Sequence, residues 1–99
     1  MPEHPLKVFE KVDPELLNVV QRSDVFTFTD GALPKKFKLL IAMALDASIG
    51  SVDGVKSLAG QAMAAGATKE EIAEALRVAQ HIRGVSTVYV AARAFKELF

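Results

Sequence analysis

The chain has 99 residues, 12 acidic and 12 basic side chains, and no cysteine. The length predicts one domain over residues 1–99. Because the charges balance, no net positive charge attracts the protein to nucleic acid or to an anionic membrane. The missing thiols exclude disulfides, thiolate nucleophiles and cysteine-based metal sites. Hydrophobic residues make up 51% of the chain, a high share for a lone small domain, so we expect a homo-oligomer.

The first residues predict no targeting segment. Residues 1–5 are neither basic nor followed by a long apolar run, unlike a signal peptide. No stretch reaches the roughly 18 uninterrupted apolar residues of a membrane span. We therefore expect a cytoplasmic protein without a membrane anchor.

The first predicted long helix begins at Asp13, because an aspartate followed by Pro14 is typical of a helix start. Its expected buried stripe consists of Leu16, Leu17 and Val20. Residues 25–29 alternate like a strand but have no partner strand. We interpret them as a helix end and a connection that leads into a turn.

Pro34 opens the next predicted helix, which is apolar on nearly all sides and so belongs in the middle of a core. Asp46 is the ionisable exception on its apolar surface. Gly50 marks a break, after which Ser51 is a plausible N-cap of a helix with an apolar stripe from Val52 to Met63.

The second half contains the sharpest boundary signals. Gly66 predicts a helix end, and the spacing of Thr68 and Glu71 is that of a capping box at the next helix start. Gly84 predicts the following break. The last helix is expected to face the core with Val85, Val88, Ala92 and Phe95. The pattern as a whole predicts an all-α bundle of five to six helices.

Three stretches in this order resemble one family. They are Asp30-Gly-Ala-Leu33 followed by Leu40-Ile-Ala-Met-Ala-Leu45, then Gly66-Ala-Thr-Lys-Glu-Glu-Ile72, then Glu74-Ala-Leu76 with Arg83-Gly84. Over residues 26–92 the chain is similar to small members of the AhpD-like, carboxymuconolactone decarboxylase superfamily. The resemblance implies an AhpD-like helical bundle, assembly into trimers or hexamers, and a pocket near the subunit contacts.

Redox members of that family carry a glutamate and then Cys-x-x-Cys-x-x-x-His. Counted from the flanking stretches, the glutamate falls on Leu39 and the two cysteines fall on Ser51 and Gly54. The histidine, which the decarboxylase branch also keeps, falls on Leu58. A leucine cannot transfer a proton. The resemblance therefore implies a member without thiol peroxidase activity and with an apolar site.

Three residues remain as candidates for catalysis, namely Asp46, Ser51 and His81. Asp46 is a carboxylate on an apolar face, which suits an acid or base, although bonding to the nearby loop or hydration is the favoured interpretation. Ser51 lacks a partner base, so helix capping is favoured. His81 shares a polar helix face with Glu74 and Arg77, which favours a structural or interface role.

Four further polar residues have weaker claims. Lys36 and Lys38 could hold an anion, but solvent exposure or an interchain ion pair is favoured. Tyr89 could reach a pocket, but core packing is favoured. His4 and His81 lack metal-ligand spacing, so we expect no metal and no cofactor.

The leading hypothesis is a non-redox, homo-oligomeric family member that binds a small apolar or anionic molecule or has a structural role. The alternative is a cofactor-independent decarboxylase or isomerase acting on a small lactone or keto acid. That enzyme would use Asp46, with His81 or Tyr89, as new acid–base groups. A third hypothesis is an unrelated helical interaction module.

Overall fold

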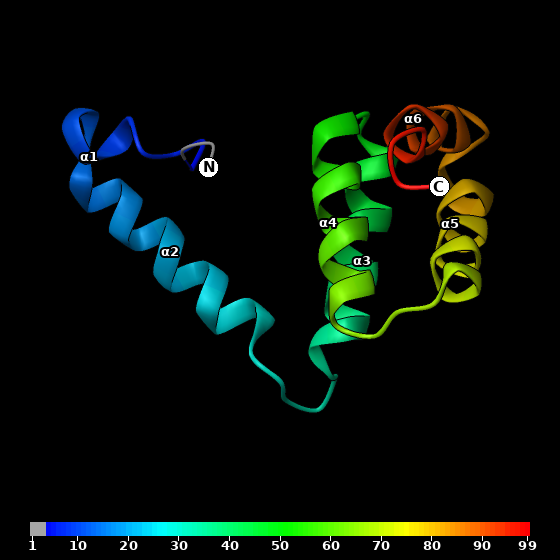
Figure 1. Ribbon diagram of the computed structural model, residues 1–99, viewed down its shortest axis with the longest axis horizontal. Helices are drawn as coiled ribbons and strands as arrows, with labels where there is room; N and C mark the ends of the chain where they lie inside the picture. The colour runs from blue at the N-terminus through cyan, green and yellow to red at the C-terminus, as the bar shows by residue number, and fades with distance from the viewer. Residues whose placement is uncertain (1–3) are drawn as a thin grey trace.

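The computed structural model describes residues 4–99, and within them every regular element is a helix. The helices of this described part are α1 (Phe9–Val12), α2 (Pro14–Phe28), α3 (Lys35–Ser48), α4 (Val52–Ala64), α5 (Lys69–Arg83) and α6 (Ser86–Phe95). Helix α3 packs against α4, α5 and α6, while α1 and α2 form an arm on one side (Figure 1). The predicted all-α class is confirmed.

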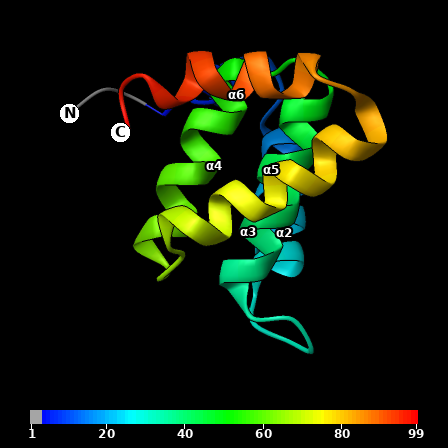
Figure 2. The same ribbon diagram turned by 90° about the vertical axis from the view of Figure 1, so that its right-hand side faces the viewer.

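The hydrophobic core lies among α3, α4, α5 and α6. Its fully buried large side chains come from three of these helices, namely Leu39, Met43, Val55 and Ile72. Alanines such as Ala59 and Ala62 fill α4 where it crosses its neighbours, and small side chains let helices approach closely. Helices α5 and α6 cross over α3 and α4 and close the core from the other side (Figure 2).

The predicted boundaries in the second half are confirmed. The Thr68 hydroxyl accepts from the Glu71 N–H at 3.1 Å, and the Glu71 carboxylate accepts from the Thr68 N–H at 2.9 Å, which completes the capping box. Gly84 ends α5 with a φ of 103°, in the left-handed region that favours glycine. Residues 25–28 form the last turn of α2, and the helix ends at Phe28.

Helix α2 begins as predicted, because the Asp13 carboxylate accepts from the Leu16 N–H at 3.0 Å and Pro14 stands in the first turn. The predicted burial of Leu16, Leu17 and Val20 is wrong, since α2 contains no buried residue. The physical reason is its position. Helix α2 slopes away from α4 and has its main contacts with α1 and α3 (Figure 1).

The predicted central position of α3 is confirmed in part, since α3 packs against α2, α4, α5 and α6 but is not covered on all sides. One face buries Leu39, Leu40, Met43 and Ala47, but on the other face Ile41 is 50% exposed and Leu45 is 62% exposed. The periodic pattern predicts an apolar surface on both sides correctly. It cannot predict that a single chain covers only one of them.

Helix α6 turns a different face inward from the one predicted. It buries Thr87, Val90, Ala91 and Ala94, while Val85, Val88 and Ala92 are exposed and Phe95 is half-buried. Residues 85–95 are apolar on nearly all sides, so their periodicity does not select a face. Within the described residues the buried Thr87 hydroxyl has no hydrogen-bond partner.

None of the described helices combines the length and the apolar character that crossing a membrane requires.

Candidate functional site

The junction between α3 and α4 brings two polar candidates together. Gly50 takes a φ of 88° in the turn, which reverses the chain after α3. The Ser51 N–H then donates to the Asp46 carbonyl at 2.9 Å, and the Ser51 carbonyl accepts from the Val55 N–H at 3.0 Å. Asp46 and Ser51 therefore meet at the start of α4. Free N–H groups at a helix start give a partial positive charge that stabilises a carboxylate.

Gly54 provides the space in which these two side chains lie. A side-chain carbon built on Gly54 would stand 2.6 Å from the Ser51 hydroxyl oxygen and 2.9 Å from Asp46 Cγ, and closer still to Asp46 Oδ2. Real side chains essentially never approach other atoms so closely. The absent side chain at Gly54 is therefore what lets the Asp46 carboxylate lie over the first turns of α4.

The favoured interpretations of Ser51 and Asp46 need correction in detail. Ser51 is the N-cap residue of α4 by position, but its hydroxyl makes no capping hydrogen bond. The bond from Asp46 to the following loop is made by its backbone carbonyl, while its half-buried carboxylate lies against Gly54. The pair offers a carboxylate next to a hydroxyl.

The two leucines that the resemblance assigns to proton-handling positions lie in or beside the core. Leu39 is 1% exposed, and Leu58 is a half-buried side chain packed against the core cluster. Neither side chain can accept or donate a proton. This part of the fold consequently presents apolar surface where acid–base chemistry would need a polar group.

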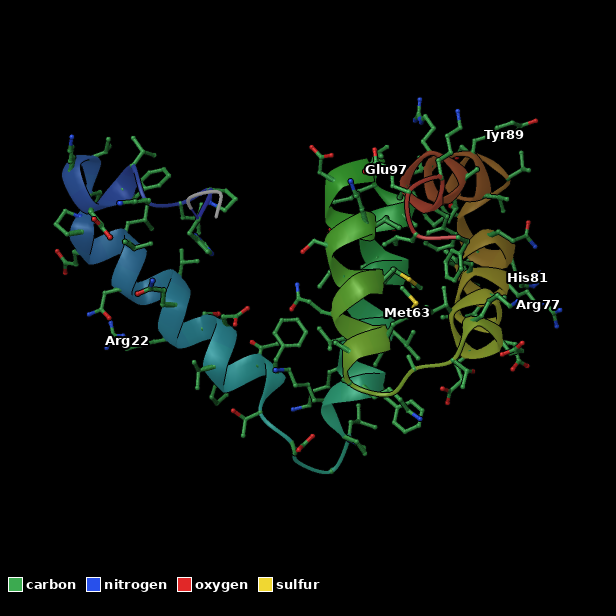
Figure 3. The ribbon with its side chains drawn as sticks, in the orientation of Figure 1. Arg22, Met63, Arg77, His81, Tyr89 and Glu97 are labelled. Atoms are coloured by element: carbon green, nitrogen blue, oxygen red, sulfur yellow. The ribbon has the colours of Figure 1, made fainter. Side chains whose placement is uncertain are left out.

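His81 and Tyr89 lie on the outer surface of the chain. His81 is exposed on α5, and Tyr89 is 69% exposed on α6, with both side chains directed outward (Figure 3). The favoured core packing of Tyr89 is therefore wrong. Asp46, at the end of α3, and His81 lie on different elements, and the hydrogen bonds found within residues 4–99 do not connect them.

Lys36 and Lys38 have partners within the chain. Lys36 Nζ lies 3.1 Å from the Glu71 carboxylate and 4.9 Å from the ring centroid of Phe37. Lys38 Nζ donates to the Thr29 carbonyl at 2.7 Å. Neither lysine is fully exposed, because both are half-buried and fasten the start of α3 to neighbouring segments.

The same contacts affect Glu71. The hydrogen bond from the Thr68 backbone N–H, followed by the bond to Lys36, holds the pKa of Glu71 below its ordinary value of 4.5. Glu71 therefore connects α5 to α3 as well as capping its own helix.

A groove between α5 and α6 was missed by the sequence analysis. It has a volume of about 320 Å³ and apolar walls that include Ile72, Leu76, Phe95 and Phe99. The two aromatic rings meet edge to face with their centroids 5.3 Å apart. Two cations, Lys69 and Arg77, and the amide of Gln80 also line it. Positions 69, 72, 73, 76, 77 and 80 share one helical face, which was the available signal.

The described part of the chain, residues 4–99, contains no group of three or more His, Cys, Asp or Glu side chains that could hold a metal ion.

Comparison with known proteins bears on this arrangement. The model of the carboxymuconolactone decarboxylase family matches residues 14–97. The structure is similar to the apo crystal structure of a carboxymuconolactone decarboxylase family protein from Legionella pneumophila. The two share 33% sequence identity with a TM-score of 0.85, over 92% of this chain and 81% of that chain. A search among curated proteins found no match.

Proposed function

Because the chain belongs to the carboxymuconolactone decarboxylase family, we propose that it is a non-redox, homo-oligomeric member that binds a small apolar molecule bearing an anionic group. The proposal joins two features. The residues that would perform the chemistry of redox relatives are replaced, and a separate groove combines apolar walls with cations.

The replaced chemistry supports the non-redox part. A chain without cysteine has no thiol to cycle through a disulfide. Ser51 and Gly54 stand at the two cysteine positions, and a thiol-bearing side chain at Gly54 would collide with the Asp46 carboxylate. Leu39 and Leu58 supply no proton relay.

The α5–α6 groove is the observation that carries the ligand proposal. Ligand sites are mostly apolar with a few well-placed polar groups, and known sites begin at about 300 Å³. This groove has that composition, with Lys69 and Arg77 among its lining residues and no aspartate or glutamate side chain lining it within the described part. Lys69 and Arg77 favour an anion, while the paired rings of Phe95 and Phe99 favour an apolar body.

Calorimetric titration with octanoate tests the ligand proposal. Octanoate combines a carboxylate with a short apolar chain, and octanol serves as the uncharged comparison. We expect Arg77→Gln to weaken octanoate binding by at least about 10-fold, because a hydrogen bond to a charged group contributes about 1.5–3 kcal/mol. Arg93→Gln, an exposed position on α6 outside the groove, is the matched control. Absent binding, or equal weakening by both variants, contradicts the proposal.

The oligomer is proposed to be a trimer or a hexamer. Large apolar side chains are exposed on α2, on the outer face of α3 and on α5, more than isolated surface residues would account for. Exposed apolar surface of this extent marks a contact with another protein surface.

The second candidate is a cofactor-independent decarboxylase or isomerase for a small lactone or keto acid. The contact of Asp46 and Ser51 over Gly54 favours it, since a carboxylate beside a hydroxyl could move a proton. The test is turnover of a panel of small lactones and keto acids, followed by product release. Any activity should be lost in Asp46→Asn and kept in Asp53→Asn, which changes an exposed carboxylate in the first turn of α4. If the native protein turns over none of these compounds, the enzyme candidate is wrong.

A further inference from the structure

A single chain exposes more surface than a compact domain of its size. Its accessible area is 7035 Å², whereas the usual scaling with mass gives about 5,500 Å² for a chain of this length. The radius of gyration is 14.4 Å, against about 12.6 Å for a compact domain. The excess of roughly 1,500 Å² exceeds the ~800 Å² that each partner contributes to a standard interface. A stable assembly therefore has enough area to form.

The α1–α2 arm supplies one part of this excess. Neither helix contains a buried residue, and Leu16, Val19 and Val20 share one exposed apolar face of α2. Phe26 near the end of α2 is 86% exposed. An amphipathic helix without a partner would not be stable on its own in water. The arm thus has the character of a helix that packs against another surface.

A long apolar groove between α3 and α5 supplies the other part. Its volume is about 680 Å³. One rim consists of Leu33, just before α3, and of Phe37, Ile41 and Leu45, which are spaced by four residues along α3. The other rim is formed by Val78 and Ile82 of α5. Between the rims lie the half-buried alanines Ala44, Ala75 and Ala79. Large rims around small residues form a channel into which an apolar helix face fits.

The arm is long enough to line the groove, and its charge is opposite to that of the groove. Helix α2 has 15 residues and so is about 22 Å long, while the helical part of the α3 rim, from Phe37 to Leu45, spans about 12 Å. Arg83 is the charged residue that lines the described groove. Helix α2 carries two acidic residues, Glu15 and Asp24, against one basic residue, Arg22. The weakly acidic helix therefore suits a groove with a cation at its edge.

The chain's own arm does not cover this groove. Helices α2 and α5 lie on opposite sides of α3 in both ribbon views (Figures 1 and 2). We propose that α2 of each copy lies in the α3–α5 groove of a second copy, so that a closed ring of subunits buries both surfaces of every chain. This inference rests on the homo-oligomeric part of the proposed function, and the octanoate groove between α5 and α6 stays outside the contact.

Two full-length point variants test the exchange by sedimentation velocity. Ile41→Asp alters the groove and Val20→Asp alters the arm, and both side chains are at least two-fifths exposed in the single chain, so the fold does not depend on them. Each variant alone should associate at least about 30-fold more weakly than the native protein. Asn18→Asp, on the opposite side of α2, is the control and should assemble normally.

Mixing the two variants gives the decisive result. The Ile41→Asp chain keeps an intact arm and the Val20→Asp chain keeps an intact groove, so the mixture should form a complex that neither variant forms alone. If Val20→Asp alone still assembles, or the mixture stays monomeric, the exchange is wrong even where the native protein is oligomeric. A monomeric native protein would overturn both this inference and the proposed oligomer.

Discussion

Replacing Gly54 by alanine tests the geometry at the α3–α4 junction. Alanine is more favourable than glycine inside a helix by about 0.5–1 kcal/mol. At Gly54 the new methyl group would stand 2.9 Å from Asp46 Cγ and 2.6 Å from the Ser51 hydroxyl, so it must displace them. Overpacking of this kind costs about 1–3 kcal/mol. We therefore expect Gly54→Ala to lower the free energy of unfolding by up to about 2 kcal/mol.

Gly60 of the same helix is the matched control. A methyl group there meets nothing within 4 Å, so Gly60→Ala should raise the free energy of unfolding by about 0.5–1 kcal/mol. Urea unfolding at one fixed protomer concentration measures both values, because subunit association adds to apparent stability.

A double variant identifies the cause of the difference. Asp46→Ala removes the displaced carboxylate, so it should restore much of the stability that Gly54→Ala loses, with a coupling of at least about 1 kcal/mol. A Gly54→Ala protein as stable as Gly60→Ala, with Asp46 in place, would refute the proposed contact.

Three other perturbations have expected outcomes. Thr68→Ala should lower the free energy of unfolding by about 1 kcal/mol, because it removes a capping hydrogen bond. Ser51→Ala should lower it clearly less, since the Ser51 hydroxyl makes no capping hydrogen bond. Equal losses for the two variants in urea unfolding would contradict this. Thr87→Val should raise the melting temperature, because it removes a buried hydroxyl without a hydrogen-bond partner in the described structure. If the free energy of unfolding instead falls by more than about 1 kcal/mol, the hydroxyl is hydrogen-bonded. The folded-state pKa of Glu71 is lowered, so its stabilisation is present above pH 4.5 and is lost as the pH falls through that lowered value. Glu71→Gln should therefore be less stable than the native protein at pH 6 and approach it in acid, and a gap that stays constant with pH would refute this.

The helix boundaries could be predicted from the sequence because local chemistry sets them. The start of α2 at Asp13, the capping box at Thr68 and the end of α5 at Gly84 each depend on residues within one turn. The apolar stripe from Val52 to Met63 was also predicted correctly, since Val55 is buried and Leu58 packs against the core.

The burial of whole faces could not be predicted in the same way. Leu16, Leu17 and Val20 have the apolar spacing of a buried stripe, yet α2 is unburied because of its direction relative to α4, which no local signal encodes. The same reasoning applies to Val85 and Val88 on α6, where an apolar segment offers several faces to the core. An apolar pattern predicts that a face becomes covered without predicting which chain covers it.

The candidate site was only partly predictable. Asp46 stood out as a carboxylate among apolar residues, but its position over Gly54 depends on the turn at Gly50. The α5–α6 groove depends on Phe99 folding back against Phe95 at the chain end, and this contact needs the tertiary fold.

The most direct test of the central claim, that one folded chain leaves an assembly surface open, is the native mass of the purified protein by sedimentation equilibrium. A large exposed area and an arm without buried residues predict an assembly of the 10.7 kDa chain across the micromolar range, which we propose to be a trimer or a hexamer. A single species with the mass of one chain throughout that range would contradict the claim.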